Sequence, residues 1–167
     1  LHFSLGSSAV FPKRFEIGYS FPLLNSFFYQ NNVGDFDNLA LFATMILQYP
    51  GIGKIWGSAY VDEMDLSSPE FFNQDRNMYA LQFGASASLP IPHLAFSNFT
   101  FQYTKIEPYV YTHQLVKTPW YDDTWMEEPY MNNGVSLGYY LPPNSDELKL
   151  RFESSVIHGG TFRFHAQ

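Results

Sequence analysis

Two groups of residues in the last third of the chain have the types and spacing that chemistry or recognition requires. In the first group, charged and imidazole side chains alternate with other residues in two neighbouring segments: Glu147, Lys149, Arg151, Glu153, Arg163 and His165. Such a row along one face of a strand pair could filter charged solutes, as charged rings do in pores. It could equally be a structural network of opposite charges paired across strands. Both interpretations remain open at this point.

The second group lies in a loop-like segment, residues 117–130, where flat aromatic rings interleave with carboxylates. Its members are Trp120, Tyr121, Asp122, Asp123, Trp125, Glu127, Glu128 and Tyr130. Aromatic faces can stack on sugar rings while carboxylates accept hydrogen bonds from sugar hydroxyls. The composition therefore predicts a loop that contacts polysaccharide. The alternative is a surface loop that packs on its own aromatic side chains.

Sequence motifs for catalysis, metal binding or cofactor binding are absent. The five histidines are scattered and none belongs to a HExxH arrangement. The sequence has no G-x-S-x-G, no P-loop and no G-x-G-x-x-G, so no nucleophile, base or nucleotide cradle can be placed. We therefore expect no enzyme activity, no metal and no cofactor. A barrel enzyme with a scattered histidine as base is the weakest alternative.

The composition excludes further classes of function. Hydrophobic residues make up 46% of the 167 residues, which excludes a disordered chain. Lys and Arg number 9 against 16 Asp and Glu, a net charge of −7, so the chain is a poor candidate for binding nucleic acid. Cysteine is absent, which excludes disulfide frameworks and thiolate chemistry.

Apolar and polar residues alternate from end to end of the chain, which is typical of half-buried β-strands. The clearest segment is 77–89, where Tyr79, Leu81 and Phe83 alternate with small or polar residues. The same pattern predicts strands over 1–5, 14–21, 38–49, 53–64, 98–104, 134–141, 147–156 and 161–166. Short connections are expected at 7–12, 50–53, 90–93 and 142–145, and long ones at 22–36, 65–76 and 113–132.

These strands predict an all-β fold, an antiparallel up-and-down transmembrane β-barrel. Segments of about 10 residues have the length that a tilted membrane strand needs. One face of these strands is rich in aromatic residues and the other is small or polar, which suits lipid outside and water inside. A soluble β-sandwich shows the same alternation and remains the structural alternative.

Residues near the predicted strand ends are expected to mark the borders of the membrane. Aromatic girdles at the two interfaces would include Tyr49, Trp56, Tyr109 and Tyr111. Lys105 and Glu107 interrupt the apolar face of their strand, and we expect them to lie above the hydrocarbon.

Residues 1–167 are expected to be one incomplete β-barrel segment without an internal domain boundary. About nine strands are visible, whereas bacterial single-chain barrels have an even number. The sequence also has no initiator Met and begins and ends in strand-like segments. We therefore expect these strands to be part of a larger barrel.

Several short segments resemble the Wzi-type capsule-assembly family of outer-membrane proteins. They are residues 34–41 (GDFDNLAL), 55–63 (IWGSAYVDE), 103–113 (YTKIEPYVYTH), 141–148 (LPPNSDEL) and 158–159 (HG). The resemblance spans most of the chain and implies a large barrel of the bacterial outer membrane, whose outer side binds capsular polysaccharide without catalysis.

We therefore expect a non-catalytic outer-membrane barrel that takes part in binding or assembling a surface polysaccharide. Its expected partners are the lipid bilayer and a polysaccharide or lipopolysaccharide. A porin-like diffusion channel is the first alternative, because the small polar face and the charged row would suit a water-filled lumen. A soluble β-sandwich binding module is the second alternative.

Overall fold

The computed structural model describes residues 1–10, 17–20, 29, 32, 38–63, 78–111, 130–156 and 161–166. Over these residues the protein is all-β. Its elements are β1 (His2–Val10), the 3-10 helix η1 (Ile17–Ser20), β2 (Asn38–Tyr49), β3 (Gly53–Glu63), β4 (Met78–Ser88), β5 (Leu94–Ile106), β6 (Met131–Asn132), β7 (Val135–Ser136), β8 (Ser145–Val156) and β9 (Thr161–Ala166). No helix within the described ranges is long and apolar enough to cross a membrane.

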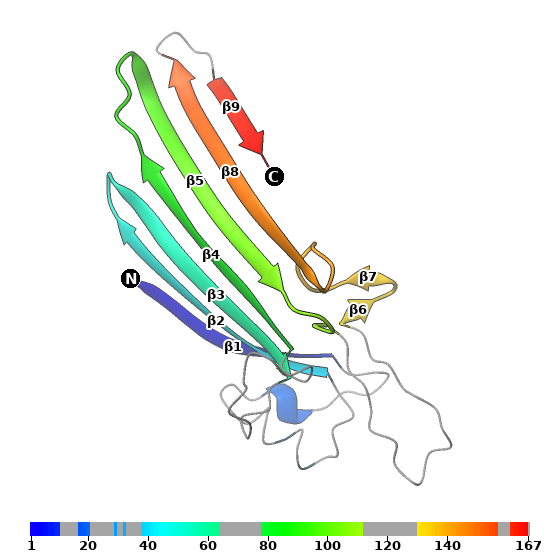
Figure 1. Ribbon diagram of the computed structural model, residues 1–167. Coiled ribbons are helices and arrows are strands. Elements are labelled where there is room, and N and C mark those ends of the chain that lie inside the picture. Colours follow the sequence, from blue (N-terminus) through cyan, green and yellow to red (C-terminus); the bar gives the residue numbers. More distant parts are fainter. Residues whose placement is uncertain are drawn as a thin grey trace, which may run out of the picture.

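Seven of the strands form one antiparallel sheet in the order β1-β2-β3-β4-β5-β8-β9. Neighbours in the sheet follow chain order, apart from the small β6–β7 hairpin, which forms a separate two-stranded sheet between β5 and β8. The prediction of an antiparallel, up-and-down all-β fold is therefore confirmed. Figure 1 shows the sheet as a curved single layer, with β1 and β9 at its two edges. These two edge strands do not pair with each other, so the described strands do not close into a barrel.

The connections between sheet strands alternate in length. Residues 50–52, 89–93 and 157–160 make the short connections, whereas 11–37, 64–77 and 107–144 make the long ones. All short connections join strands at one end of the sheet, which we call the short-turn end, and the opposite end is the long-loop end. At the first hairpin the N–H of Ile52 donates to the carbonyl of Tyr49 (3.1 Å), and Gly51 between them has φ +78°. This positive φ is the reason for a glycine at that position of the turn.

The register divides the side chains of the sheet into two faces with different chemistry. Residues directly opposite each other across two strands point to the same side. Thr44, Ser58, Gln82, Thr104 and Glu147 stand in one such row across β2, β3, β4, β5 and β8. We call this side the polar face. Apart from the strand ends beyond the register shifts at Val61/Glu63 and Leu94/Phe96, it carries the even-numbered residues of β1–β5 and the odd-numbered residues of β8 and β9. The opposite side is the apolar face.

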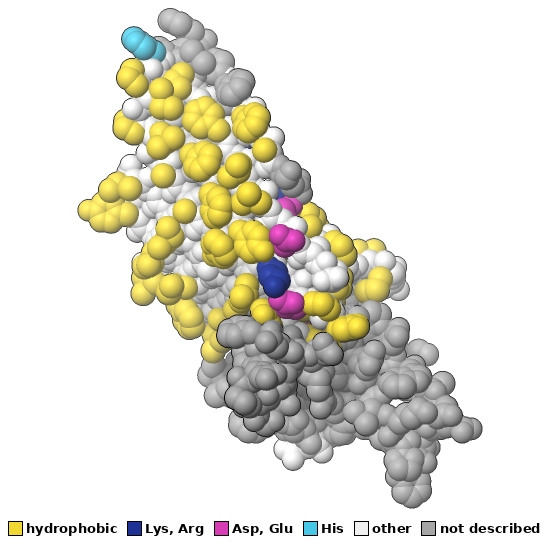
Figure 2. Space-filling model, in the orientation of Figure 1, with side chains coloured by type: hydrophobic (Ala, Val, Ile, Leu, Met, Phe, Trp, Pro, Cys, Tyr) yellow, Lys and Arg dark blue, Asp and Glu magenta, His cyan; other side chains and the backbone are white. Residues whose placement is uncertain are grey.

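The apolar face is largely exposed. Large side chains that are 38–62% exposed stand on six strands of this face, namely Phe3, Leu5, Met45, Leu47, Ile55, Leu81, Phe83, Phe99 and Leu148. Figure 2 shows hydrophobic side chains spread over the sheet, with the few charged side chains of this view close together. The charged residues of this face are Lys105 and Asp146, which are opposite each other near the long-loop end. Lys105 forms an ion pair with Glu107 (2.6 Å), just beyond the last residue of β5.

Buried apolar residues gather at the long-loop end of the polar face. Ile106, Val110 and Tyr111 are at most 8% exposed and form a small cluster. Residues from β3, β4 and the 130–141 segment pack against this cluster. The core is thus local, because 107–111 and 130–141 fold back onto one end of the sheet while most of the sheet remains a single layer.

Some predicted elements are wrong. The strand predicted over 14–21 is contradicted at Ile17–Ser20, which form η1. The short connection expected at 7–12 is also wrong, because β1 continues to Val10 and a long connection follows. In 134–141 only Val135–Ser136 are strand, since this segment bonds to the polar face instead of extending the sheet. Of the expected girdle residues, Trp56 lies on the polar face and Tyr111 is buried.

Candidate functional site

The six residues of the charged row all lie on the polar face of β8 and β9. Glu147, Lys149, Arg151 and Glu153 occupy alternate positions of β8, and β9 places His165 opposite Arg151 and Arg163 opposite Glu153. Alternation within a strand and antiparallel pairing between strands account for this placement. The sequence pattern therefore predicted their common face.

The row divides into two networks of charges. Near the short-turn end, Glu153 accepts from Arg151 (2.6 Å) and pairs with Arg163 (3.3 Å). The two arginine side chains are 51% and 71% exposed, so these pairs are worth at most about 1 kcal/mol each. Nearer the long-loop end, Lys149 pairs with Glu147 (3.1 Å), which is only 7% exposed.

Tyr140 completes the second network. Its hydroxyl donates to Oε1 of Glu147 and accepts from Nζ of Lys149 (2.6 Å), and the ammonium lies 4.5 Å from the centre of the Tyr140 ring. The Glu147 carboxylate is thus hydrogen-bonded through Oε1 and ion-paired with Lys149 through Oε2, next to the 130–141 segment. Glu147 and Lys149 are therefore engaged in holding this segment, whereas Arg151 and Arg163 are the more accessible charges of the row.

The aromatic and acidic loop predicted to bind polysaccharide lies mostly outside the described residues. This holds for Trp120, Tyr121, Asp122, Asp123, Trp125, Glu127 and Glu128. Tyr130, its last member, is described and lies over the polar face. Its hydroxyl donates to Oγ of Ser8 on β1 (2.8 Å), and its N–H donates to the carbonyl of Tyr111 (2.8 Å).

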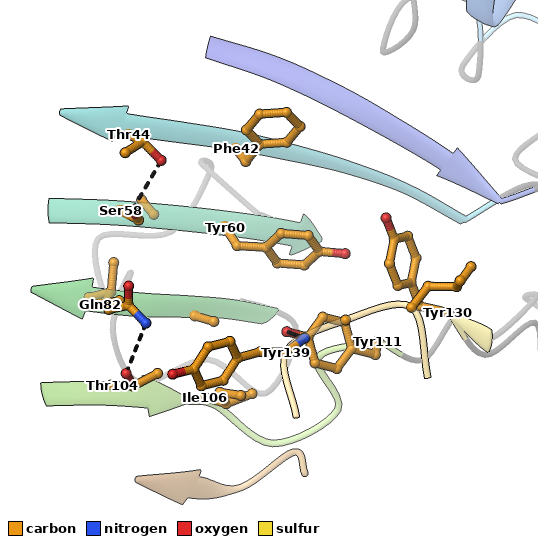
Figure 3. A pocket seen from close by; sticks show the side chains of 15 residues that line it. Phe42, Thr44, Ser58, Tyr60, Gln82, Thr104, Ile106, Tyr111, Tyr130 and Tyr139 are labelled. Carbon is orange, nitrogen blue, oxygen red and sulfur yellow. Dashed lines mark hydrogen bonds between the residues drawn. The ribbon is translucent and has the colours of Figure 1, made fainter. Parts of the chain in front are cut away.

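Tyr130 borders a pocket of about 310 Å³ that the sequence did not predict. We call it the tyrosine pocket, because its walls include Tyr60, Tyr111, Tyr130 and Tyr139 together with Phe42. Figure 3 shows these rings arranged around a hollow above β2, β3, β4 and β5. The tyrosines come from β3 and from the segments that follow β5 and flank the β6–β7 hairpin.

The floor of the tyrosine pocket is polar and uncharged. Thr44 and Ser58 share a hydrogen bond between hydroxyls (3.0 Å), and Nε2 of Gln82 donates to Oγ1 of Thr104 (3.1 Å). Figure 3 shows both bonds at one side of the rings. The four residues are neighbours in a single register row, so antiparallel pairing alone brings them together.

The backbone of Tyr111 holds its ring in place at the cost of an unusual conformation. Its φ is +74°, a region that bulky residues rarely adopt. The N–H of Tyr111 donates to a carboxylate oxygen of Asp62 on β3 (2.6 Å). The hydroxyl of Tyr111 accepts from the N–H of Tyr139 (3.0 Å). Burial raises the pKa of the Tyr111 hydroxyl; the bond from Tyr139 lowers it, and Asp62 raises it further. This tyrosine therefore stays neutral at physiological pH.

The tyrosine rings also pack on one another. The centre of the Tyr60 ring lies 5.4 Å from that of Tyr111 and 6.2 Å from that of Tyr130, both edge-on, while Tyr111 and Tyr130 stack at 5.8 Å. Gly138 packs directly against the Tyr111 ring, where a β-carbon would collide with it. The hydroxyl of Tyr60 is buried and finds no hydrogen-bond partner among the described residues. Tyr60, Tyr111 and Tyr130 thus hold one another in place through these ring contacts.

Sequence reasoning missed the tyrosine pocket because its residues are far apart in the chain. Tyr60 and Tyr139 were assigned to alternating strands, and Tyr111 to a membrane border. One signal was available: Tyr139, Tyr130 and Tyr111 lie in the longest connection between sheet strands, 107–144, and long connections often carry function.

The described residues contain no cluster of three or more His, Asp or Glu side chains that could hold a metal ion. Comparison with known proteins gives no further guide. No protein-family model matches the chain, no curated protein is similar to it, and no solved structure matches its fold.

Proposed function

We propose that this chain forms part of the wall of a non-catalytic β-barrel of the bacterial outer membrane that binds a surface polysaccharide. One observation carries the barrel part of the proposal, namely the two-faced sheet. Its apolar face exposes large hydrophobic side chains over six strands, while its polar face is bridged by hydrogen bonds. An exposed apolar surface of this extent requires either lipid or a protein partner.

The height of the apolar face fits a bilayer. On β4, Tyr79 lies beside the Lys105–Glu107 ion pair, and Leu89 follows the strand at the short-turn end. The ten residue positions from Tyr79 to Leu89 span about 33 Å of strand at about 3.3 Å per residue. If the strand is tilted by about 40° from the membrane normal, the band is about 25 Å tall, which is the height of the apolar band of outer-membrane barrels. Lys105 and Asp146 stand level with Leu81, two residues from Tyr79, so these charges then lie within about 5 Å of the border of the band.

The strand lengths and connections agree with this proposal. β2, β3, β4, β5 and β8 have 11–13 residues, enough for a tilted membrane strand. Short connections at one end of a sheet and long ones at the other are typical of outer-membrane barrels. Because β1 and β9 each pair with only one strand within the described residues, closure would require further strands beside them.

The polysaccharide part of the proposal is supported by the resemblance to capsule-assembly proteins and by the tyrosine pocket on the polar face.

Refolding of the full-length gene product from urea tests the barrel part. We expect β-structure by circular dichroism and heat-modifiable migration on a gel in detergent micelles, and no cooperative folding in plain buffer. Cooperative folding in buffer alone would favour the soluble sandwich and would remove the membrane proposal.

A diffusion channel is the second candidate, and the exposed arginines of the charged row favour it. Arg151 and Arg163 stand on the polar face with half or more of their side chains accessible. In a water-filled lumen they would favour anions. Planar-bilayer recordings of the full-length protein would show anion-selective steps, and a silent bilayer would eliminate this candidate.

A further inference from the structure

The tyrosine pocket has the chemistry of a subsite for one sugar ring. We infer that it binds an uncharged sugar residue of a polysaccharide chain, with the ring stacked against tyrosines and its hydroxyls on the polar floor. This inference rests on the proposed function and names the class of ligand and the place where it binds.

The walls provide stacking surfaces. Tyr139 and Tyr111 stand at the β5 side of the pocket, and Phe42 and Tyr60 come from β2 and β3 (Figure 3). A pyranose presents C–H groups on its two flat sides, and aromatic faces attract such partly positive hydrogens. Tyr139 is positioned for this contact because its hydroxyl accepts a hydrogen bond from Gln102 (3.2 Å).

The floor supplies both donors and acceptors. An amide side chain has two N–H donors and a carbonyl acceptor, and Gln82 uses one N–H on Thr104. The hydroxyls of Thr44 and Ser58 bond to each other, and each retains further capacity. Sugar hydroxyls also donate and accept, so they match a floor of this mixed kind better than an apolar ligand would.

The absence of charge around the pocket selects a neutral sugar. No acidic or basic side chain is among the residues that line it within the described part of the chain. Two charged groups beside the pocket walls are engaged elsewhere: Asp62 accepts from the N–H of Tyr111, and Lys149, whose ammonium lies 5.9 Å from the centre of the Tyr139 ring, pairs with Glu147. A uronic acid would therefore lose hydration without gaining an ion pair, which is unfavourable.

The size and rigidity of the pocket fit a single ring. A volume of about 310 Å³ is at the lower end of small-molecule sites. The walls are held before any ligand arrives, by Asp62 on the backbone of Tyr111 and by Ser8 on the hydroxyl of Tyr130. A preformed site spends little binding energy on ordering its side chains.

Calorimetry on the full-length protein in detergent micelles tests this inference. The probes are three neutral hexasaccharides (maltohexaose, cellohexaose and chitohexaose) and the acidic hexagalacturonate. We expect at least one neutral probe to bind, and Tyr139→Ala and Gln82→Leu to weaken it about tenfold and about fivefold. Tyr49→Ala is the matched control, because Tyr49 is 68% exposed at the short-turn end, far from the pocket along β2. Heat-modifiable migration verifies that each variant is folded.

Three outcomes would overturn the inference. The first is folded wild type that binds none of the neutral probes. In the second, Tyr139→Ala and Gln82→Leu leave binding unchanged, whereas the double variant Trp120→Ala with Trp125→Ala abolishes it. This result would place the glycan on the aromatic loop. The third is a preference for hexagalacturonate. The second and third outcomes leave polysaccharide binding itself intact, whereas failure to fold in micelles would remove the proposed barrel.

Discussion

Phe83 provides the sharpest test of what surrounds the apolar face. It lies near the middle of β4, is 50% exposed, and its ring centre is 6.1 Å from that of Phe101 and 5.4 Å from that of Tyr103. Phe83 lies four positions along the strand from Tyr79, which places it about 10 Å below the border of a tilted apolar band. That depth is close to the centre of a hydrocarbon layer of about 25 Å.

Two substitutions at this site separate packing from charge. Phe83→Ala removes a half-buried ring and its contacts with the neighbouring aromatic rings. We expect this loss to lower the free energy of unfolding by about 1–2 kcal/mol in any environment. Phe83→Arg loses the same contacts and also places a cation at the centre of the band, which costs a further 2–4 kcal/mol or so in lipid. In water the arginine stem would instead cover apolar surface, and Arg would be no worse than Ala.

The measurement is the free energy of unfolding in urea of the full-length protein refolded into phosphatidylcholine vesicles, followed by tryptophan fluorescence. The decisive quantity is the difference between the arginine and alanine variants. We expect the arginine variant to be less stable by about 2 kcal/mol or more, a factor of about 30 in the unfolding equilibrium. Equal stabilities of the two variants would refute a lipid environment for this face.

Three further predictions follow from the polar face. Gly84→Ala should destabilise the folded protein by about 1–3 kcal/mol, because a β-carbon there would be 2.7 Å from the carbonyl oxygen of Phe101. An unchanged urea midpoint would contradict this close contact between Gly84 and Phe101. Glu153→Gln should change stability by less than about 1 kcal/mol, since its two arginine partners are mostly exposed, and a larger loss would mean a desolvated network. Tyr130→Phe should cost about 1 kcal/mol by removing the bond to Ser8; unchanged thermal unfolding would show that this bond contributes nothing.

The sheet was largely predictable from sequence because period-two alternation is a local signal. β2, β3, β4 and β8 agree with the predicted ranges to within about two residues, the usual uncertainty of element ends. The segment at Ile17–Ser20 alternates in the same way but forms a 3-10 turn, so alternation alone did not decide between pairing and coiling. The common face of the charged row was predictable for the same reason as the strands.

The tyrosine pocket was not predictable because it depends on contacts between distant parts of the chain. Tyr130 bonds to Ser8, which lies 122 residues earlier, and Tyr111 bonds to Asp62, 49 residues earlier. No local pattern encodes how the 130–141 segment folds back onto the sheet. The left-handed backbone of Tyr111 is likewise a consequence of tertiary contacts, since a tyrosine has no intrinsic preference for it.

The open edges of the sheet have a consequence for how the protein would enter a membrane. β1 has nine residues, and in an antiparallel strand about half of the backbone N–H and C=O groups point away from its partner. On that edge about nine polar groups would face hydrocarbon, each at a cost of several kcal/mol. Insertion of these strands alone is therefore forbidden by tens of kcal/mol. If the proposed barrel forms, insertion and edge pairing would occur as one cooperative event, and an assembly intermediate with an open β1 edge would remain outside the bilayer core.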